Sequence, residues 1–282
     1  MQFVVANDPA PDSANTTRLD GRAGLLVGKV VVVSGLGPGL GRHVARRSAM
    51  AGAKCVLGAR TPEKIDEVVA EISELGGEAM GRRCDVRDPA DCAALIAAGQ
   101  EHFGGIDVLV NNAFRGPSFR PVADADTDNW RKTFDVNVFG TLEMTQAAIP
   151  AIRARGGGSI VFVNSMASRD TPPGQADYAA SKASLFVIAR SLAAELGPDK
   201  IRVNTVVPGW MWGPGVQWYC DNEAKQRGCD PSDVYDEIAA NIALGEIPTD
   251  EDCAGAVVFF ASELSNVITG QALDVNGGEY FA

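Results

Sequence analysis

Short aliphatic and β-branched runs alternate with longer amphipathic stretches from Lys29 to the C-terminus. The clearest run is Val30-Val31-Val32-Val33, because four consecutive valines are typical of a strand that is buried on both faces. Similar runs predict six further strands, at 55–57, 80–84, 106–110, 159–164, 201–207 and 272–275. The stretches between them predict helices at 42–51, 62–75, 89–103, 128–154, 178–196 and 251–262.

This alternation predicts an α/β fold: a single doubly wound Rossmann-type domain, with a seven-stranded parallel sheet and helices on both faces. We expect the domain to cover residues 25–282 and to follow an N-terminal extension over residues 1–24, which contains a polar, proline-containing run. Ligands of such sheets bind beyond the carboxyl ends of the strands. The residues that carry chemistry should therefore follow the strands.

Residues 210–245 interrupt the alternation, since this segment is long and has no clear strand. It contains Trp210, Trp212, Trp218 and Tyr219. Loops of this length inside a compact domain are usually functional, so we expect a substrate-binding loop region here. Its aromatic side chains favour a sizeable apolar or alicyclic substrate.

A glycine-rich segment follows the first predicted strand and opens a helix, in Ser34-Gly35-Leu36-Gly37-Pro38-Gly39-Leu40-Gly41. Glycine permits a tight turn and a close approach of the backbone to a diphosphate, and the helix N-terminus stabilises negative charge there. Plain turns also use glycine, but the strand–loop–helix context favours a dinucleotide cofactor. We expect that cofactor to contact Gly35, Gly39, Leu40 and Gly41.

The choice between NAD and NADP depends on the end of the second strand, where an acidic side chain would bind both ribose hydroxyls. The sequence there is Gly58-Ala59-Arg60, without a carboxylate. Arginine presents a fork of donors that suits a phosphate, so the sequence favours NADP, with NAD as the alternative. A solvated Arg60 that only ends the strand is a second interpretation.

Tyr178 and Lys182 lie four residues apart in a predicted helix, which places them on one face, one turn apart. An ammonium group beside a phenol favours the phenolate, so Lys182 is expected to lower the pKa of Tyr178. Tyr178 could then exchange a proton near neutral pH. Taken alone, this spacing is common on helix surfaces.

A larger pattern surrounds this pair. The chain carries, in one order, Ser34-Gly35-x-x-x-Gly39-x-Gly41, Asn111-Asn112-Ala113, Asn137, Ser165, Tyr178-x-x-x-Lys182 and Pro208-Gly209. In order and spacing these motifs resemble those of the short-chain dehydrogenase/reductase family, from about Leu25 to the C-terminus. The resemblance implies an NAD(P)-dependent oxidoreductase that acts on a small-molecule alcohol or ketone.

The resemblance also implies roles for single residues. Tyr178 would be the general acid/base, Lys182 would lower its pKa and bind the nicotinamide ribose, and Ser165 would orient the substrate oxygen. Asn137 would hold a water molecule that connects Lys182 to solvent. Further cofactor contacts are implied at Asp85, Val86, Asn111, Ala113, Pro208 and Gly209.

Two positions depart from the family pattern. Phe114 stands where a glycine often follows Asn-Asn-Ala, and this should narrow the mouth of the pocket. Trp210-Met211-Trp212-Gly213 stands where many members have a threonine that contacts the cofactor. Two other function classes stay open: a non-redox enzyme on the same fold, and a catalytically silent nucleotide-binding relative.

Composition excludes other classes of function. The 282 residues include 25 basic and 36 acidic side chains, a net charge of −11, which argues against nucleic-acid binding. No apolar run is long enough to predict a membrane span, and no secretory signal pattern is present. Six cysteines without a Cys-x-x-Cys pair, and only two histidines, predict reduced thiols, a cytoplasmic location and no metal site. From the family resemblance we also expect a homotetramer, or else a dimer.

Overall fold

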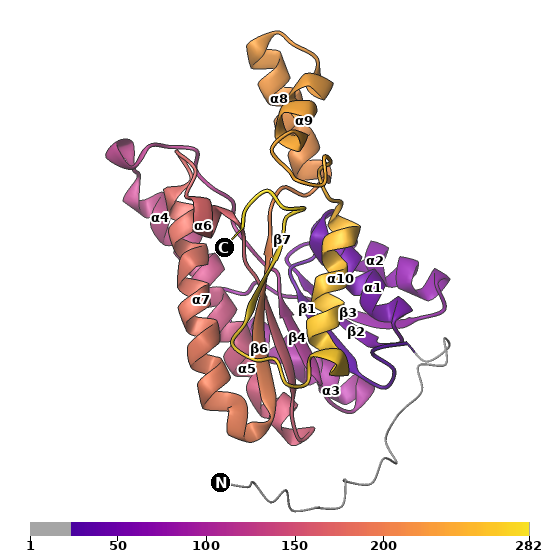
Figure 1. The fold of residues 1–282 in the computed structure, drawn as a ribbon. Helices are drawn as coiled ribbons and strands as arrows, with labels where there is room; N and C mark the ends of the chain where they lie inside the picture. Colours follow the sequence, from indigo (N-terminus) through magenta and orange to yellow (C-terminus); the bar gives the residue numbers. More distant parts are fainter. Residues whose placement is uncertain (1–23, 282) are drawn as a thin grey trace, which may run out of the picture.

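The seven predicted strands form one parallel sheet in a computed structural model that describes residues 24–281 (Figure 1). The strand order is β3-β2-β1-β4-β5-β6-β7, and every neighbouring pair is parallel. The strands are β1 Val30–Ser34, β2 Lys54–Ala59, β3 Glu78–Arg83, β4 Val108–Asn111, β5 Gly158–Val163, β6 Ile201–Pro208 and β7 Ala272–Val275. The predicted fold class is confirmed. The extension expected over residues 1–24 lies, except for Gly24, outside the described residues.

Helices cover both faces of the sheet. The α-helices are α1 Leu40–Met50, α2 Pro62–Glu74, α3 Pro89–Phe103, α4 Thr127–Phe134, α5 Gly140–Ala154, α6 Ala167–Asp170, α7 Ala176–Leu196, α8 Pro214–Arg227, α9 Pro231–Ala239 and α10 Asp250–Ala261. Short turns of other helix types are η1 Val122–Asp124, η2 Asp135–Phe139, η3 Gly197–Asp199 and η4 Glu263–Ser265.

The four valines of β1 explain the two-layered core. Val31 and Val33 pack with the apolar residues of α1, α2 and α10. Val30 and Val32 point to the other face and pack with those of α3, α5 and α7. Since side chains alternate between the faces of a strand, an unbroken apolar run is what two helix layers require.

The helix predicted over residues 128–154 is continuous but not uniform. Between α4 and α5 the chain makes one π-helical turn, η2, which contains Asn137. Single π-helical turns of this kind are frequent at functional sites. The turn brings the buried side chain of Asn137 to α7, as described below.

The expectation of a loop over residues 210–245 is wrong, because most of this segment forms the helices α8 and α9. Proline occupies the first turn of both helices, Gly228 ends α8 in a left-handed conformation, and Asp230 caps α9. These are ordinary signals for helix starts and stops. Figure 1 shows the two helices side by side, projecting away from the sheet.

The sequence analysis expects neither a membrane-spanning helix nor a metal site. No helix between residues 24 and 281 combines the length and apolarity that a membrane crossing requires. In the same range, no group of three or more His, Cys, Asp or Glu side chains is arranged to hold a metal ion.

Candidate active site

The glycine-rich segment is held against the end of β4. Gly35 has a φ of 96°, and a side chain there would collide with the backbone of Ala113. The side-chain amide of Asn112 donates to the carbonyl oxygen of Gly35 over 2.6 Å. A side chain at Gly41 would strike the same carbonyl. The loop therefore requires glycine at both positions, and it leaves the first amides of α1 available to an anion, as a dinucleotide diphosphate requires.

Asn111, expected beside the cofactor, uses its side chain elsewhere. Its amide donates to the Thr145 hydroxyl on α5 over 2.9 Å, and the residue is buried. Asn112, which the sequence analysis gave no role, makes the bond to the glycine loop. The asparagine doublet thus fixes β4 to a helix on one side and to the loop on the other.

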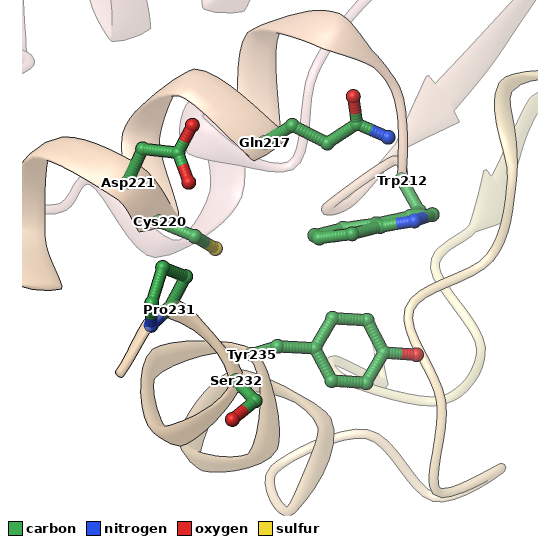
Figure 2. A pocket seen from close by; sticks show the side chains of 7 residues that line it. All are labelled: Trp212, Gln217, Cys220, Asp221, Pro231, Ser232 and Tyr235. Carbon is green, nitrogen blue, oxygen red and sulfur yellow. The ribbon is translucent and has the colours of Figure 1, made fainter. Parts of the chain in front are cut away.

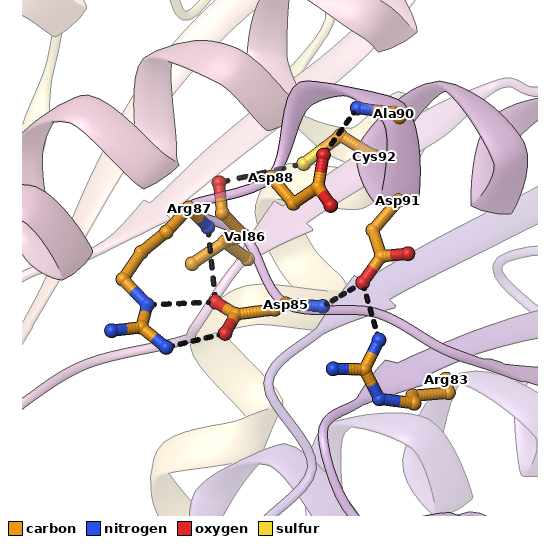
Figure 3. A network of polar contacts seen from close by, with 8 residues as sticks. All are labelled: Arg83, Asp85, Val86, Arg87, Asp88, Ala90, Asp91 and Cys92. Carbon is orange, nitrogen blue, oxygen red and sulfur yellow. Dashed lines mark hydrogen bonds and ion pairs between the residues drawn. The ribbon is translucent and has the colours of Figure 1, made fainter.

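A network of ion pairs shapes the segment after β3 (Figure 3). The Arg87 guanidinium donates twice to the Asp85 carboxylate, at 3.0 and 2.5 Å. These bonds hold the pKa of Asp85 at about 2, so the carboxylate is ionised at neutral pH. The Asp85 main-chain N–H donates to Asp91 over 3.0 Å, and Val86 is buried. Asp85 and Val86 are thus rigidly held at the carboxyl end of the sheet.

Arg60 lies one residue beyond the end of β2 and is exposed. It is near enough to Asp85 for its charge to favour the ionised carboxylate. Within residues 24–281 its guanidinium takes part in no ion pair, whereas Arg83 pairs with Asp91 and Arg87 with Asp85. Arg60 therefore keeps its donors available for another anion.

Tyr178, Lys182 and Ser165 come together at the start of α7. The Lys182 ammonium nitrogen lies 5.8 Å from the centre of the Tyr178 ring and donates to the Val163 carbonyl over 2.8 Å. Ser165 follows β5, and its hydroxyl accepts from the Ala167 N–H over 3.2 Å. The structure thus brings together three of the four residues that the sequence analysis assigned to catalysis, and Asn137 is the fourth.

The expected lowering of the Tyr178 pKa by Lys182 is wrong here. Burial raises the pKa of Tyr178 to about 12, and hydrogen bonding from the Ser165 side chain opposes this only in part. Burial also lowers the pKa of Lys182 to about 7, since only 2% of this side chain is exposed. Desolvation disfavours both charged forms and outweighs their attraction. The site therefore holds a neutral phenol, which can donate a proton.

Asn137 acts through its hydrogen bonds rather than through contact with the site's centre. Its side-chain oxygen accepts from the Arg115 N–H over 2.7 Å. Its amide nitrogen donates to the Arg115 carbonyl over 3.0 Å and to the Ser181 hydroxyl over 2.8 Å. Both amide protons are used, so Asn137 is a positioning residue between the segment after β4 and α7. The expected role in a proton relay stays a prediction.

Two buried residues of the site were missed by sequence reasoning. Asp177, 1% exposed, accepts from the Ser118 N–H at 3.3 Å and the Asn129 side chain at 3.2 Å. Asn164 donates to the Lys182 carbonyl at 3.0 Å. Each is a sequence neighbour of a catalytic candidate. Nothing in the local sequence signals their partners, which lie on other elements.

The aromatic residues of 210–245 line two cavities beside α8 and α9. The larger, about 560 Å³, lies between these helices (Figure 2), and its lining residues are Trp212, Gln217, Cys220, Asp221, Pro231, Ser232 and Tyr235. The smaller, about 210 Å³, includes Trp210, whose ring lies 5.1 Å from that of Tyr219. Neither is lined by Tyr178. Trp218 is 64% exposed and lines neither cavity.

Phe114 and the segment Pro208–Gly209 complete the surroundings of Tyr178. The Phe114 ring is 59% exposed and lies 6.2 Å from the Tyr178 ring. Phe114 therefore lies close to Tyr178, and the expected narrowing of the pocket mouth stays a prediction. The Pro208 carbonyl accepts from the Met166 N–H over 2.8 Å, and the Gly209 N–H donates to Val275 over 3.2 Å. The end of β6 is therefore fixed beside Ser165.

Comparisons with known proteins agree with this arrangement. A protein-family model described as enoyl-(acyl carrier protein) reductase matches residues 35–279. Dehydrogenase/reductase SDR family member 4 of Homo sapiens is 34% identical over 253 residues, which cover 90% of this chain and 88% of the relative. Short-chain reductase protein NovJ of Streptomyces niveus is 36% identical over 249 residues, 88% of this chain and 93% of its own.

Solved structures give the same result. A short-chain type dehydrogenase/reductase from Mycobacterium marinum superposes with a TM-score of 0.79 at 29% identity, covering 91% of this chain and 97% of that one. A structure from Sinorhizobium meliloti 1021 superposes with a TM-score of 0.81 at 32% identity, covering 90% and 97%. The similarity therefore extends over nearly the whole fold.

We predict that Asn137→Ala destabilises the protein by about 2–4 kcal/mol, because it leaves the Arg115 backbone and the Ser181 hydroxyl without their partner. Asn241→Ala is the matched control, since that exposed amide only bonds to the Glu237 carbonyl, and it should cost less than about 0.5 kcal/mol. Chemical denaturation measures both. Equal losses in the two variants would contradict the positioning role.

Proposed function

Because the chain belongs to the short-chain dehydrogenase/reductase family, we propose that it transfers a hydride between NADP(H) and an alcohol or carbonyl compound. Family membership makes it an oxidoreductase; the substrate and the catalytic roles are our proposal. The single observation that supports them best is the grouping of Tyr178 and Ser165 with the buried Lys182 at the carboxyl edge of the sheet.

The glycine loop fits a dinucleotide. Side chains at Gly35 or Gly41 would collide with Ala113 or with the Gly35 carbonyl, and the first amides of α1 are not capped by a side chain, so they could bind the diphosphate. Asp85 and Val86 would hold the adenine, and Pro208 and Gly209 would lie along the nicotinamide, together with Asn111 and Ala113 at the cleft wall. When bound, the nicotinamide supplies or accepts the hydride.

The protein's own residues then handle the proton. In reduction, the neutral Tyr178 phenol donates its proton to the oxygen of the carbonyl, which the Ser165 hydroxyl holds in place. A pKa of about 12 suits this direction, since the phenol stays protonated at neutral pH. In the reverse direction the phenol oxygen must accept a proton, and positive charge at Lys182 and the ribose contact would favour that.

Arg60 supports NADP rather than NAD. It is exposed at the end of β2, carries no ion pair among the described residues, and lies near Asp85, which would mark the adenosine end of the cofactor. A 2′-phosphate would neutralise its charge.

Aromatic side chains of the segments that follow β4 and β6 support the proposed substrate class. Trp210, Tyr219 and Phe114 offer aromatic surface, which suits a sizeable apolar or alicyclic ketone or alcohol. The smaller cavity also contains Glu223, Arg227 and Glu237, so polar substituents could be accommodated. A panel of ketones, alcohols and an enoyl thioester, followed by loss of reduced-nicotinamide absorbance, separates carbonyl from alkene reduction. No redox change with any of them would favour the non-redox or catalytically silent alternatives.

We predict that Tyr178→Phe lowers single-turnover hydride transfer at least about a hundredfold, the low end for losing general acid–base catalysis. The ring remains, so cofactor affinity should stay at the wild-type value. Lys182→Ala should reduce both turnover and cofactor affinity, and Ser165→Ala mainly turnover. A Tyr178→Phe rate within about threefold of wild type would mean that the proton travels by another route.

Cofactor preference is tested by fluorescence titration with NADPH and NADH. We expect NADPH to bind more tightly, and Arg60→Ala to weaken NADPH binding selectively, because one phosphate partner is lost. Arg131→Ala is the control, since it removes an exposed arginine whose partner is Asp128 on α4. NADH binding as tight as NADPH, or an equal loss of both in Arg60→Ala, would assign NAD instead.

For the assembly we propose a homotetramer, with a dimer as the alternative, built on α5, α7 and the C-terminal segment. Val187 on α7 leaves 65% of its apolar surface exposed, which is consistent with a contact face there. Light scattering at micromolar concentration gives the mass. A monomer would refute the proposal.

A further inference from the structure

Asp250 is a buried carboxylate at the glycine loop that neither catalysis nor the family pattern explains. It is the first residue of α10, directly after the Thr249 cap, and only 6% of it is exposed. Within residues 24–281 its side chain accepts no hydrogen bond and joins no ion pair. A buried carboxylate without a hydrogen bond or an ion pair destabilises the fold unless another interaction compensates for its lost hydration.

The Asp250 carboxylate packs closely against two glycines, Gly213 and Gly39. The Trp212 N–H donates to the Pro248 carbonyl over 2.7 Å, and Trp212 forms a parallel bridge with Thr249. This bridge presses Gly213 against the Asp250 carboxylate, where any side chain would collide. On the opposite side, a side-chain carbon at Gly39 would stand 3.1 and 3.4 Å from the two carboxylate oxygens.

Gly39 is also the N-cap of α1. The diphosphate of a dinucleotide would therefore sit at the amides that begin one residue after Gly39, within a few ångströms of Asp250. Two like charges would then share a poorly solvated space. At about 6 Å and an effective dielectric constant near 20, such a repulsion exceeds what a tenfold change in affinity requires.

The other charges around Asp250 offer little compensation. Among residues 24–281, His43, one turn into α1, is the one side chain whose charge favours the ionised form of Asp250, and its Nδ1 is buried without a hydrogen-bond partner in the same range. Arg47 on α1 is paired with Glu251 at 3.4 Å, and Asp252 is bonded to the Thr249 hydroxyl at 2.6 Å. The glycine loop and residues 209–213 carry no charged side chains. Burial accordingly raises the pKa of Asp250 above its usual range.

We propose that Asp250 links dinucleotide binding to protonation: its carboxylate takes up one proton from solvent when the diphosphate occupies the N-terminus of α1. This inference rests on the proposed cofactor function. The proton forms an O–H bond on a carboxylate oxygen, and no other bond changes. Protonation removes the repulsion. The neutral carboxyl group of Asp250, between Gly39 and Gly213, is then a hydrogen-bond donor that can face the diphosphate.

The sign of the pH dependence follows. A neighbouring negative charge raises the pKa of an acid, so the pKa of Asp250 is higher in the complex than in the free protein. Dinucleotide affinity is then greatest at pH values below the pKa of Asp250 in the free protein. Between this pKa and the higher pKa in the complex, the affinity falls by up to tenfold per pH unit. At pH values above the pKa of Asp250 in the complex, the affinity no longer depends on the protonation of this group.

The test measures NADPH and NADP⁺ binding by calorimetry between about pH 5 and about pH 8, in buffers of different ionisation enthalpy, which counts the protons taken up. The wild type should take up between zero and one proton, with a maximum inside this range. Asp250→Asn keeps the shape of the side chain and should take up almost no protons. At about pH 8 it should bind at least about tenfold more tightly than the wild type.

Glu251→Gln is the matched control, since it removes the same charge from the next residue of α10 and should keep the wild-type proton uptake. Wild-type binding without proton uptake would overturn the role of Asp250 and needs no variant. Undiminished uptake in Asp250→Asn would overturn it as well. Absence of dinucleotide binding at every pH would instead refute the proposed function itself.

Discussion

The parallel register of β1 with β4 is the constraint on which the rest of the site depends. It pairs Ser34 with Asn111, so Gly35 and Asn112 leave the sheet side by side. The Asn112 side chain can then hold the Gly35 carbonyl, and the loop turns directly into α1. The contact excludes side chains at Gly35 and Gly41, and it aims the amides of α1 at one place. The proposed diphosphate site lies at these amides.

Desolvation gives the two ends of the site a common electrostatic character. At α7 it favours the neutral phenol of Tyr178 and lowers the pKa of Lys182 to about 7. At α10 it favours the neutral form of Asp250. In each case the fold removes water without supplying a full counter-charge, so the protonation state is left for a ligand's charge to decide. The oxidised nicotinamide is positively charged and the diphosphate is negatively charged, so they would shift the pKa values of these groups in opposite senses.

Buried side-chain amides and carboxylates do most of the positioning. Asn137 ties the segment after β4 to α7, Asn164 ties the end of β5 to the Lys182 backbone, and Asp177 gathers Ser118 and Asn129 around the start of α7. Each bond satisfies a polar group that would be costly to leave unpaired in the interior. The residues proposed for catalysis therefore lie on backbone that these neighbouring side chains hold in place.

By itself the sequence determined the strands and the doubly wound class, which follow from local periodicity, and the pairing of Tyr178 with Lys182, which follows from helix spacing. The place of Ser165 beside this pair was implied by the family resemblance. The sequence also contained the caps of α8 and α9, although the missing strand pattern suggested a loop. Only the tertiary structure decided the direction of the Tyr178 and Lys182 pKa shifts, the partners of Asn137 and Asp177, and the wedging of Asp250 between Gly39 and Gly213. The physical reason is that burial and hydrogen-bond partners depend on segments far apart in the chain, and no local pattern encodes which of them will meet.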